Sequence, residues 1–303
     1  MKQPFRNLNG ILILDKPIGL SSNQALQKVK KLFQAKKAGH TGSLDVLATG
    51  VLPICFGEAT KFSQFLLEAD KVYQVTGKLG ERTTTCDSEG KIIEKKSTEH
   101  VTKEKISNVI KHFLGETLQT PSMYSALKHH GKPLYELARQ GIEVERVPRK
   151  IFISQIEFIA YHDDKLTLEV HCSKGTYIRN LIDDVGQALN SGAYVTALRR
   201  LKAGPFDASQ MVTIDTLQNY FEQNGLEAMD EFLLPIDSML QHLSKIILDE
   251  KQLQSLRYGQ TVLLSSEKEG VVKLYDAREN FVGVGEISLD GVLRGCRLII
   301  ETQ

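Results

Sequence analysis

The sequence predicts an α+β fold that ends in a small β-barrel. Up to about residue 201, segments with apolar residues at helical spacing alternate with segments at strand spacing. Residues 151–160 and 165–172 flank Asp163-Asp164, a pattern typical of a β-hairpin and therefore of antiparallel pairing. Residues 261–300 consist of short apolar runs separated by glycines, which predicts a β-barrel appended at about residue 247.

The first elements are a strand over residues 10–14 and a helix that follows two consecutive serines. Either Ser21 or Ser22 can cap this helix, because apolar side chains recur at helical spacing directly after them. A third element, over residues 51–56, has the composition of a strand. Because Pro53 has no N–H to donate, we expect that strand to lie at an edge or an end of its sheet.

Further helices and strands follow from the same two periodicities. Helices are expected over 58–69, 103–114, 134–140 and 178–189, and strands over 71–79 and 193–201. In the C-terminal barrel, strands are expected over 261–264, 271–275, 281–287, 292–294 and 298–300. The chain of 303 residues is long enough to bury a sizeable core, as one large domain or two smaller ones.

Composition disfavours several classes of protein. Hydrophobic residues at 41% and charged residues at 25% are ordinary values for a soluble globular chain. No apolar run approaches the roughly 18 residues of a membrane-spanning helix, and the apolar run before Asp15 is too short for a signal peptide. The four cysteines are scattered, with no Cys-x-x-Cys pair. This disfavours disulfides and a zinc ribbon, and it indicates a reducing, cytoplasmic location.

The distribution of charge is more informative than the net charge of +1. Residues 1–40 hold eight basic residues and one acidic residue, and residues 120–150 hold six basic and three acidic residues. Residues 214–240 hold six acidic residues and no basic one. A polyanion such as nucleic acid would contact the first two stretches and avoid the third. The alternative is that all three are ordinary solvated surfaces.

The most informative segment is the loop over residues 39–50, GHTGSLDVLATG. Gly39 and Gly42 permit a positive φ or a close approach of the backbone. The segment lacks the spacing of a P-loop or of a dinucleotide fingerprint. Taken alone, it also fits an ordinary turn in which Asp45 accepts hydrogen bonds from the backbone.

Four blocks of sequence resemble, in order, those of the bacterial tRNA pseudouridine-55 synthases (pseudouridine synthase II). The loop over 39–50 resembles their catalytic loop, and DKPIGLSS at 15–22 resembles their N-terminal motif. YSALK at 124–128, with LYE and ARQG downstream, resembles their RNA-gripping insertion. CSKGTYIR at 172–179 resembles their second active-site motif. The similarity weakens after about residue 205, where the C-terminal barrel resembles only an RNA-binding PUA-like module.

The resemblance implies a pseudouridine synthase fold, in which helices flank a mixed, mainly antiparallel sheet. It implies a catalytic domain over residues 1–246, with the RNA-gripping insertion over 120–150, and a PUA-like domain over 247–303. The implied activity is isomerisation of uridine 55 in the tRNA T-loop to pseudouridine, after the base is flipped out of its stack. Uracil leaves ribose at N1 and is reattached through C5. Because no group is imported and no electron is transferred, we expect no cofactor and no metal. The partners that we expect are a tRNA T-arm and no second copy of the chain, that is, a monomer.

The resemblance also assigns the residues of the active site. Asp45 is implied as the carboxylate that assists departure of the base, by attack on the sugar or on the base or by removal of a sugar proton. Arg179 would hold that carboxylate ionised through a two-point contact. Tyr73 would stack on the flipped uracil, and its hydroxyl would handle a proton. Tyr177 and Leu198 would form the walls that exclude water.

Contacts to the rest of the RNA are implied as well. His40 would fill the space that the flipped base vacates and stack on neighbouring bases. Phosphate contacts are expected from basic side chains that position RNA without reading its sequence, namely Lys16, Lys128, Lys132, Arg139, Arg146 and Arg149. One departure is visible: Val46 stands where the family usually has proline, so the loop loses one fixed φ angle.

Two other functions fit the same residues. An RNA-binding protein that helps tRNA to fold would need the same basic surfaces and no chemistry at Asp45. A related synthase that modifies ribosomal RNA with guide partners would share the catalytic motifs. The insertion over 120–150 disfavours that reading, because it suits recognition of tRNA without a guide.

Overall fold

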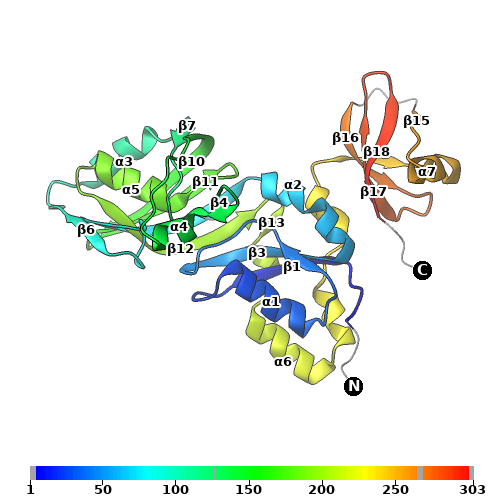
Figure 1. Ribbon diagram of the computed structural model, residues 1–303, viewed down its shortest axis with the longest axis horizontal. Helices are drawn as coiled ribbons and strands as arrows, with labels where there is room; N and C mark the ends of the chain where they lie inside the picture. The colour runs from blue at the N-terminus through cyan, green and yellow to red at the C-terminus, as the bar shows by residue number, and fades with distance from the viewer. Residues whose placement is uncertain (1–4, 126, 265–268, 300–303) are drawn as a thin grey trace.

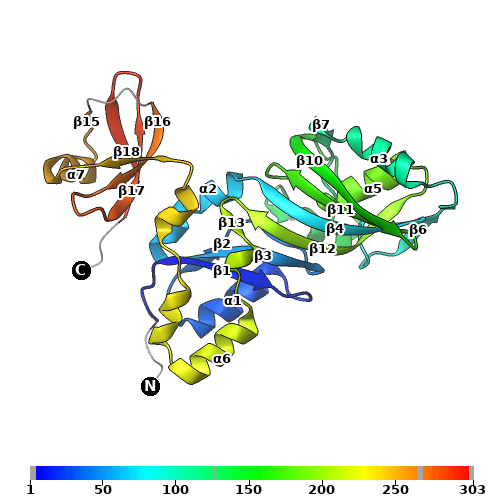
Figure 2. The ribbon, with the colours of Figure 1, turned by 180° about the vertical axis from the view of Figure 1, so that it is seen from behind.

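The computed structural model describes residues 5–125, 127–264 and 269–299, except for the side chains of residues 128 and 135. Figure 1 shows a large sheet with helices packed against it and a small β unit beyond one end of that sheet. Figure 2 shows the same arrangement from behind, with the small unit next to α2 (Ser63–Glu68).

The large sheet contains nine strands among the described residues. They are β1 (Gly10–Lys16), β2 (Ala38–His40), β3 (Ala48–Phe56), β4 (Lys71–Leu79), β7 (Gly115–Gln119), β10 (Arg149–His162), β11 (Lys165–Cys172), β12 (Ala193–Ala203) and β13 (Phe206–Asp207). The order is β1-β3-β12-β4-β11-β10-β7, with β2 paired to β3 and β13 paired to β12. Every pair is antiparallel except β12 with β3. The predicted mixed, mainly antiparallel sheet is therefore confirmed.

Seven α-helices accompany the two β units in the described part of the chain. They are α1 (Ser22–Leu32), α2, α3 (Lys103–Lys111), α4 (Leu134–Arg139), α5 (Ile178–Ala188), α6 (Ile214–Asn224) and α7 (Glu250–Arg257). The 3-10 helices are η1 (Gly57–Phe62), η2 (Ala208–Gln210), η3 (Glu227–Phe232) and η4 (Ile236–Leu240). Two short hairpins complete the inventory: β5 (Glu81–Thr83) with β6 (Ile92–Lys95), and β8 (Lys128–His129) with β9 (Lys132–Pro133). The single helix expected over 58–69 is in fact η1 followed by α2.

Two local predictions are confirmed in detail. Ser21 caps α1 in a capping box, in which its hydroxyl accepts from the Gln24 N–H and the Gln24 side chain accepts from the Ser21 N–H. Asp163 and Asp164 both adopt positive φ, at 50° and 60°. Those angles suit the two-residue turn that follows the right-handed twist of a hairpin, and β10 and β11 pair directly across it.

The two faces of the large sheet are covered differently. Leu12 and Leu14 of β1 face a core that α1, α3, α5 and α6 share, whereas Ile11 and Ile13 face a second core formed with η1, α2 and η4. Figure 1 shows α1 and α6 on one side of β1 and β3, with α2 on the other. Because β1 is buried on both faces, its apolar residues run continuously instead of alternating with polar ones.

The expectation that residues 51–56 form an edge strand is wrong. β3 lies inside the sheet, between β1 and β12. The Pro53 carbonyl accepts from the Thr41 N–H, on the side of β3 away from β1. Because the nitrogen and the carbonyl of one strand residue point to the same side, the missing N–H of Pro53 also faces away from β1. On that side the pairing with β2 ends at Ile54, and the pairing with β12 ends at Gly50. No strand therefore requires an N–H from position 53.

The small β unit is a five-stranded half-barrel, which confirms the predicted C-terminal β structure. Its strands are β14 (Ser244–Ile247), β16 (Gly270–Tyr275), β17 (Phe281–Ile287), β18 (Val292–Leu298) and β15 (Val262–Leu263), in that order. The strands expected over 292–294 and 298–300 are one continuous strand, β18, and residue 300 lies outside the described residues. Val284 of β17 belongs to the second core of the large sheet. Phe281 packs on Phe62 with ring centroids 5.5 Å apart.

Close contact between the last turn of α5 and the start of β12 fixes how the helix packs on the sheet. A Cβ added at Gly186 would lie 2.3 Å from the Ala193 nitrogen, in rigid backbone. We therefore expect Gly186→Ala to lower the free energy of unfolding by about 2 kcal/mol, because overpacking outweighs the better helix propensity of alanine. Urea unfolding followed by circular dichroism measures the change.

The matched control is Gly39→Ala, whose added Cβ would meet only Thr60 at 4.0 Å. Its unfolding midpoint should stay close to that of the parent chain. Equal stability of the two variants would contradict the argument that α5 needs glycine at position 186.

Candidate active site

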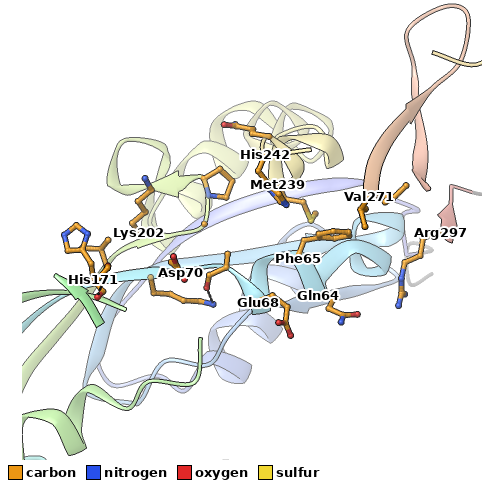
Figure 3. Close-up of a pocket in the computed structure, with 18 of the residues that line it drawn as sticks. Gln64, Phe65, Glu68, Asp70, His171, Lys202, Met239, His242, Val271 and Arg297 are labelled. Carbon is orange, nitrogen blue, oxygen red and sulfur yellow. Dashed lines mark hydrogen bonds between the residues drawn. The ribbon is translucent and has the colours of Figure 1, made fainter. Parts of the chain in front are cut away.

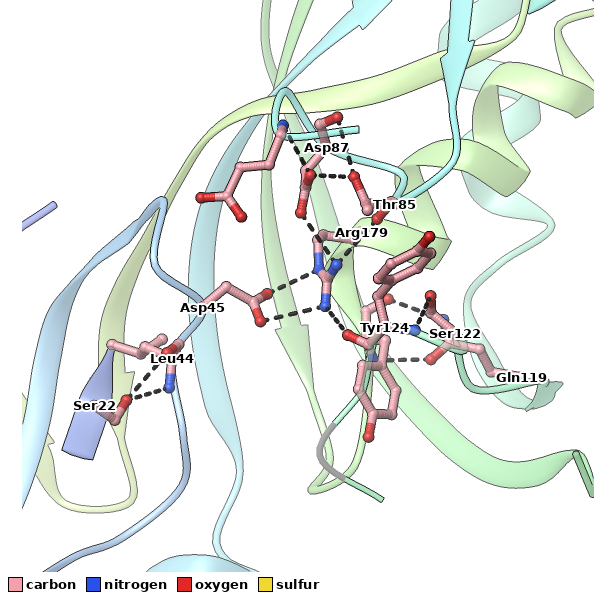
Figure 4. Close-up of polar contacts among 11 residues, drawn as sticks. Ser22, Leu44, Asp45, Thr85, Asp87, Gln119, Ser122, Tyr124 and Arg179 are labelled. Atoms are coloured by element: carbon pink, nitrogen blue, oxygen red, sulfur yellow. Dashed lines mark hydrogen bonds and ion pairs between the residues drawn. The ribbon is translucent and has the colours of Figure 1, made fainter. Parts of the chain in front are cut away.

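The loop that carries Asp45 is anchored to the start of α1. The buried Ser22 hydroxyl donates to the Leu44 carbonyl at 3.1 Å and accepts from the Leu44 N–H at 2.7 Å (Figure 4). The Gly19 N–H donates to the Val46 carbonyl at 2.9 Å. The valine at position 46 therefore takes part in a loop that backbone hydrogen bonds already tie down on both sides of Asp45.

Arg179, in the first turn of α5, is the centre of the polar network. Its Nε lies 2.8 Å from one Asp45 carboxylate oxygen, and its Nη2 lies 3.2 Å from the other. Nη2 also donates to the Tyr124 carbonyl at 2.9 Å. Nη1 donates to the Thr85 carbonyl at 3.0 Å and to the Asp87 carboxylate at 3.1 Å. The four N–H bonds of Nη1 and Nη2 therefore all donate to an acceptor, while Nε lies at ion-pair distance from Asp45. The predicted two-point contact with Asp45 is present.

Asp87 is a site residue that the sequence analysis did not identify. Its side chain is 3% exposed and forms the second ion pair of Arg179. The Thr85 hydroxyl and the Glu89 N–H donate to its carboxylate, which holds the oxygens in place. In the sequence this aspartate follows a run of threonines and resembles an ordinary turn residue. Only the long-range contact with α5 distinguishes it.

The predicted catalytic residues meet around one cavity of about 290 Å³. Its lining includes Asp45, Tyr73, Tyr177, Arg179 and Leu198, together with Lys71 and Arg200. They come from the Asp45 loop, β4, β12 and the start of α5, elements that are far apart in sequence. The Asp45 side chain is 41% exposed, so a ligand in the cavity can reach its carboxylate.

Burial and charge shape the ionisation of these groups. Burial raises the pKa of Asp45 above its usual range, and the Arg179 guanidinium opposes that rise. Burial likewise raises the pKa of Tyr73 and of Tyr177, which keeps both hydroxyls protonated at neutral pH. The cavity thus presents two neutral phenols and one carboxylate, whose ionisation depends on its guanidinium partner.

His40 ends β2 and lies beside the site without lining the cavity. Its side chain is half-buried, and its Nδ1 has no hydrogen-bond partner among the described residues. Burial, and then the charge of Arg200, lower the pKa of His40 below its usual value. The ring is therefore neutral near pH 7, with one nitrogen unused.

The expected phosphate contact at Lys16 is not supported, because Lys16 is completely buried. Its Nζ donates to the Pro17 and Leu20 carbonyls, at 2.9 and 2.5 Å, and burial lowers its pKa to about 8. Its place in the DKP motif is explained by this structural contact between β1 and the following turn. An ammonium group in that position does not reach RNA at the surface.

The basic insertion stands next to the site. Its Tyr124 carbonyl contacts Arg179, and Met123, Leu134 and Leu137 form a small apolar cluster of their own. Lys132 and Arg139 lie on its surface, and Arg149 is also exposed, whereas the Lys128 side chain lies outside the described part of the structure. Arg146 instead donates to the Pro121 carbonyl at 3.1 Å, within the insertion.

A larger cavity, of about 860 Å³, lies elsewhere (Figure 3). Val72, His171 and Lys202 line it and are cross-strand partners in β4, β11 and β12. Tyr73, the next residue of β4, points to the opposite face, toward the Asp45 cavity. The larger cavity holds none of the predicted catalytic residues, so its size does not identify the site.

No group of three or more His, Cys, Asp or Glu side chains among the described residues could hold a metal ion. None of the helices in the described ranges is long and apolar enough to cross a membrane.

Solved structures with the same fold define the class of protein. The chain matches the structure titled "Crystal Structure of a Cbf5-Nop10-Gar1 Complex" with a TM-score of 0.71 and 27% identity, covering 93% of this chain and 79% of that one. It matches "Structure of H/ACA RNP bound to a substrate RNA containing 2'-deoxyuridine" with a TM-score of 0.72 and 23% identity, covering 96% and 85%. The fold is that of the pseudouridine synthases, as the sequence blocks predicted.

Sequence comparisons identify the family. A model described as "TruB family pseudouridylate synthase (N terminal domain)" matches residues 30–178, and two models of TruB C-terminal domains match 179–241 and 244–299. The chain is 52% identical to the tRNA pseudouridine synthase B of Mannheimia succiniciproducens over 296 residues, 97% of each chain. It is 51% identical to that of Haemophilus influenzae (strain 86-028NP) over 304 residues, 99% of this chain and 98% of the other. The chain belongs to the TruB family of pseudouridylate synthases.

The second ion pair of Arg179 gives a test of the network. We expect Asp87→Asn to lower the single-turnover rate of pseudouridine formation by about 10- to 100-fold, because a hydrogen bond to a charged group contributes about 1.5–3 kcal/mol. Asparagine keeps the shape but loses the charge that orients Arg179. Rapid-quench assays on an RNA substrate measure the rate.

Asp184→Asn is the control, since that carboxylate is exposed and contacts no part of the Arg179 network. Its rate should match that of the parent chain. An unchanged rate in Asp87→Asn would remove Asp87 from the site.

Proposed function

We propose that this chain converts uridine 55 in the T-loop of tRNA to pseudouridine, without a cofactor. One observation carries the proposal: a reachable carboxylate, Asp45, held by a buried guanidinium at the wall of a cavity. The relatives named tRNA pseudouridine synthase B support tRNA as the substrate, over nearly the whole chain. The product is an isomer of the substrate, so the site needs acid, base and nucleophile groups and nothing else.

Asp45 assists the departure of uracil from ribose. A carboxylate can attack the sugar or the base, or it can remove a sugar proton. Each of these routes requires the ionised form of Asp45, placed against the nucleoside. Burial disfavours that form, and RNA phosphates nearby would disfavour it further, so the guanidinium partner is essential.

Arg179 acts on Asp45 and not on the substrate. Its four Nη N–H bonds donate to protein acceptors and its Nε lies against the Asp45 carboxylate, so none is left for the uracil or the ribose. Its function is to hold the carboxylate ionised and oriented. Four separate acceptor residues fix its own position.

Tyr73, Tyr177 and Leu198 form the walls that receive the flipped base. Tyr73 offers a ring for stacking and a neutral hydroxyl for proton transfer, and Leu198 offers an apolar surface. Flipping a base out of its stack costs a few kcal/mol. Stacking of His40 on the neighbouring bases would offset about 1–3 kcal/mol of that cost.

The insertion grips the T-arm from the side opposite the sheet. Lys132 and Arg139 lie on its surface, and these two residues and Lys128 contact phosphates in this proposal. A segment of this kind suits recognition by shape, without a guide RNA. The protein acts as a monomer, with a catalytic domain and a PUA-like domain that adds RNA contacts. We place the boundary before residue 244 and not at 247, because β14 (Ser244–Ile247) pairs with β16.

The activity is tested with unmodified tRNA that carries tritium at C5 of uracil. Isomerisation breaks the C5–H bond, so the parent chain should release one equivalent of tritium from position 55 per tRNA. Asp45→Asn should bind the tRNA with similar affinity and release none. No release by the parent chain at stoichiometric enzyme would contradict the proposal.

Two controls separate the alternatives. A tRNA with cytidine at position 55 should release no tritium from its remaining uridines, and release at another position would move the target site. Asp45→Asn should still help an unfolded tRNA to reach its native form if the basic surfaces also serve folding. Full tritium release by Asp45→Asn would remove Asp45 from the chemistry.

The pH dependence of the reaction rate tests whether the ion pair with Arg179 keeps Asp45 ionised. Because Arg179 lowers the pKa of Asp45, its removal raises that pKa. The rate requires ionised Asp45, so the acid limb of the pH–rate profile of Arg179→Met should move to higher pH, by about one pH unit or more. Single-turnover rates between pH 5 and 9 measure the profile.

Arg199→Met is the matched control, because that guanidinium pairs with Asp15 instead, at 2.9 Å. Its acid limb should stay in place. A profile of Arg179→Met that is lower but unmoved would show that Arg179 does not control the ionisation of Asp45.

A further inference from the structure

Arg200 is a buried guanidinium in the wall of the Asp45 cavity that none of the sequence motifs accounts for. It is 1% exposed and is one of the largest fully buried side chains. It lies on β12 directly across from Tyr73 on β4, as a cross-strand partner. Side chains of such partners lie on the same face of a sheet with Cβ atoms about 5 Å apart, and both residues line the cavity.

Its charge has no acidic partner in the described part of the chain. Nε donates to the Val51 carbonyl at 2.7 Å, and Nη2 donates to the Gly42 carbonyl at 3.1 Å. These contacts use two of its five N–H bonds and neutralise none of its charge. The other two arginines nearby differ, since Arg179 pairs with Asp45 and Asp87 and Arg199 pairs with Asp15.

A buried cation without a counter-charge is costly, so a chain that keeps one gains something from it. The cost is visible in the neighbours, because the Arg200 charge helps to lower the pKa of Lys16 and of Lys71, after burial. At Tyr73 the effect is favourable. Burial raises the pKa of that hydroxyl, and the positive charge of Arg200 opposes the rise.

We propose that Arg200 is a positioning residue that acts through Tyr73, by orienting its hydroxyl over the cavity and stabilising negative charge on the phenolic oxygen. This inference rests on the proposed function. Arg179 does not take this part, because its four Nη N–H bonds donate to other acceptors and its Nε lies against Asp45. Arg200 is the cation of the cavity wall that faces Tyr73 directly.

The proton balance of the reaction gives this contact a use. After uracil is reattached, C5 carries both the new bond to C1′ and its original hydrogen, and N1 lacks a proton. The C5–H bond must break, its electron pair must return to the ring, and a proton must reach N1. The Tyr73 hydroxyl can pass its own proton toward the base and accept the C5 proton in return. Its oxygen then carries transient negative charge, which the Arg200 guanidinium stabilises.

The competing explanation is a structural brace. By holding the Gly42 carbonyl, Arg200 also supports the loop that carries Asp45. A brace would act on Asp45 whether or not Tyr73 has a hydroxyl, whereas a residue that acts through Tyr73 loses its effect when that hydroxyl is removed. A double-mutant cycle separates the two.

The cycle compares Arg200→Gln in the parent chain and in Tyr73→Phe, by single-turnover tritium release from tRNA. In the parent chain we expect Arg200→Gln to lower the single-turnover rate about 100-fold, as for removal of proton-transfer assistance. In Tyr73→Phe the further loss should stay within about two-fold. The same loss in both backgrounds would overturn the proposal. Arg199→Gln, the neighbour that pairs with Asp15, should show no dependence on Tyr73.

A second measurement applies if Arg200→Gln does not fold. Arg200→Lys keeps the charge and loses the planar fork, so it should slow the proton transfer most. The isotope effect on the rate, measured with uracil deuterated at C5, should be larger in Arg200→Lys than in the parent chain. An equal isotope effect would overturn the proposal. Absence of any tritium release by the parent chain would instead contradict the proposed function itself.

Discussion

The guanidinium of Arg179 is the contact on which the rest of the site depends. It joins four separate parts of the chain: the loop of Asp45, the turn of Thr85 and Asp87, the insertion at Tyr124, and α5. A carboxylate in a cavity loses hydration, and a lone buried charge is unstable. The pair with Arg179 counters both effects, because the guanidinium supplies the opposite charge, while Asp87 and two backbone carbonyls hold the guanidinium in place. The reacting carboxylate is left as the exposed member of an otherwise buried network.

The large sheet supplies the rigidity that this network needs. β4 and β12 are central strands, and they carry Tyr73, Leu198 and Arg200 on the same face. The close approach of α5 to β12 at Gly186, in the last turn of the helix, packs α5 firmly on the sheet, and Arg179 projects from the first turn of the same helix. Catalytic groups on strands and on the first turn of a packed helix hold their positions better than groups on free loops. The loop around Asp45 is tied to Ser22 and Gly19 by hydrogen bonds.

The sequence predicts much of this arrangement, and its failures have physical reasons. The capping serine, the Asp163-Asp164 hairpin and the meeting of Asp45 with Arg179 follow from local chemistry and from motifs. The prediction from Pro53 was wrong because proline lies between the end of the pairing with β2 and the end of the pairing with β12. Where those pairings end depends on residues far along the chain. The predicted phosphate contact of Lys16 is not supported, and the sequence could not show why. Lysine is rarely buried, and only the fold places this ammonium group among backbone carbonyls. Asp87 was missed because an aspartate in a polar turn has no local mark of a partner 92 residues away.

The central claim is that Asp45, held by Arg179, faces the nucleoside in the smaller cavity. A crystal structure of this chain with a T-arm RNA tests it most directly. The account predicts the target nucleoside flipped between Tyr73 and Leu198, with its ribose or base within ~3.5 Å of the Asp45 carboxylate and with both Arg179 contacts intact. A nucleoside bound in the larger cavity on the other face, or an Asp45 side chain turned away from it, would contradict the account.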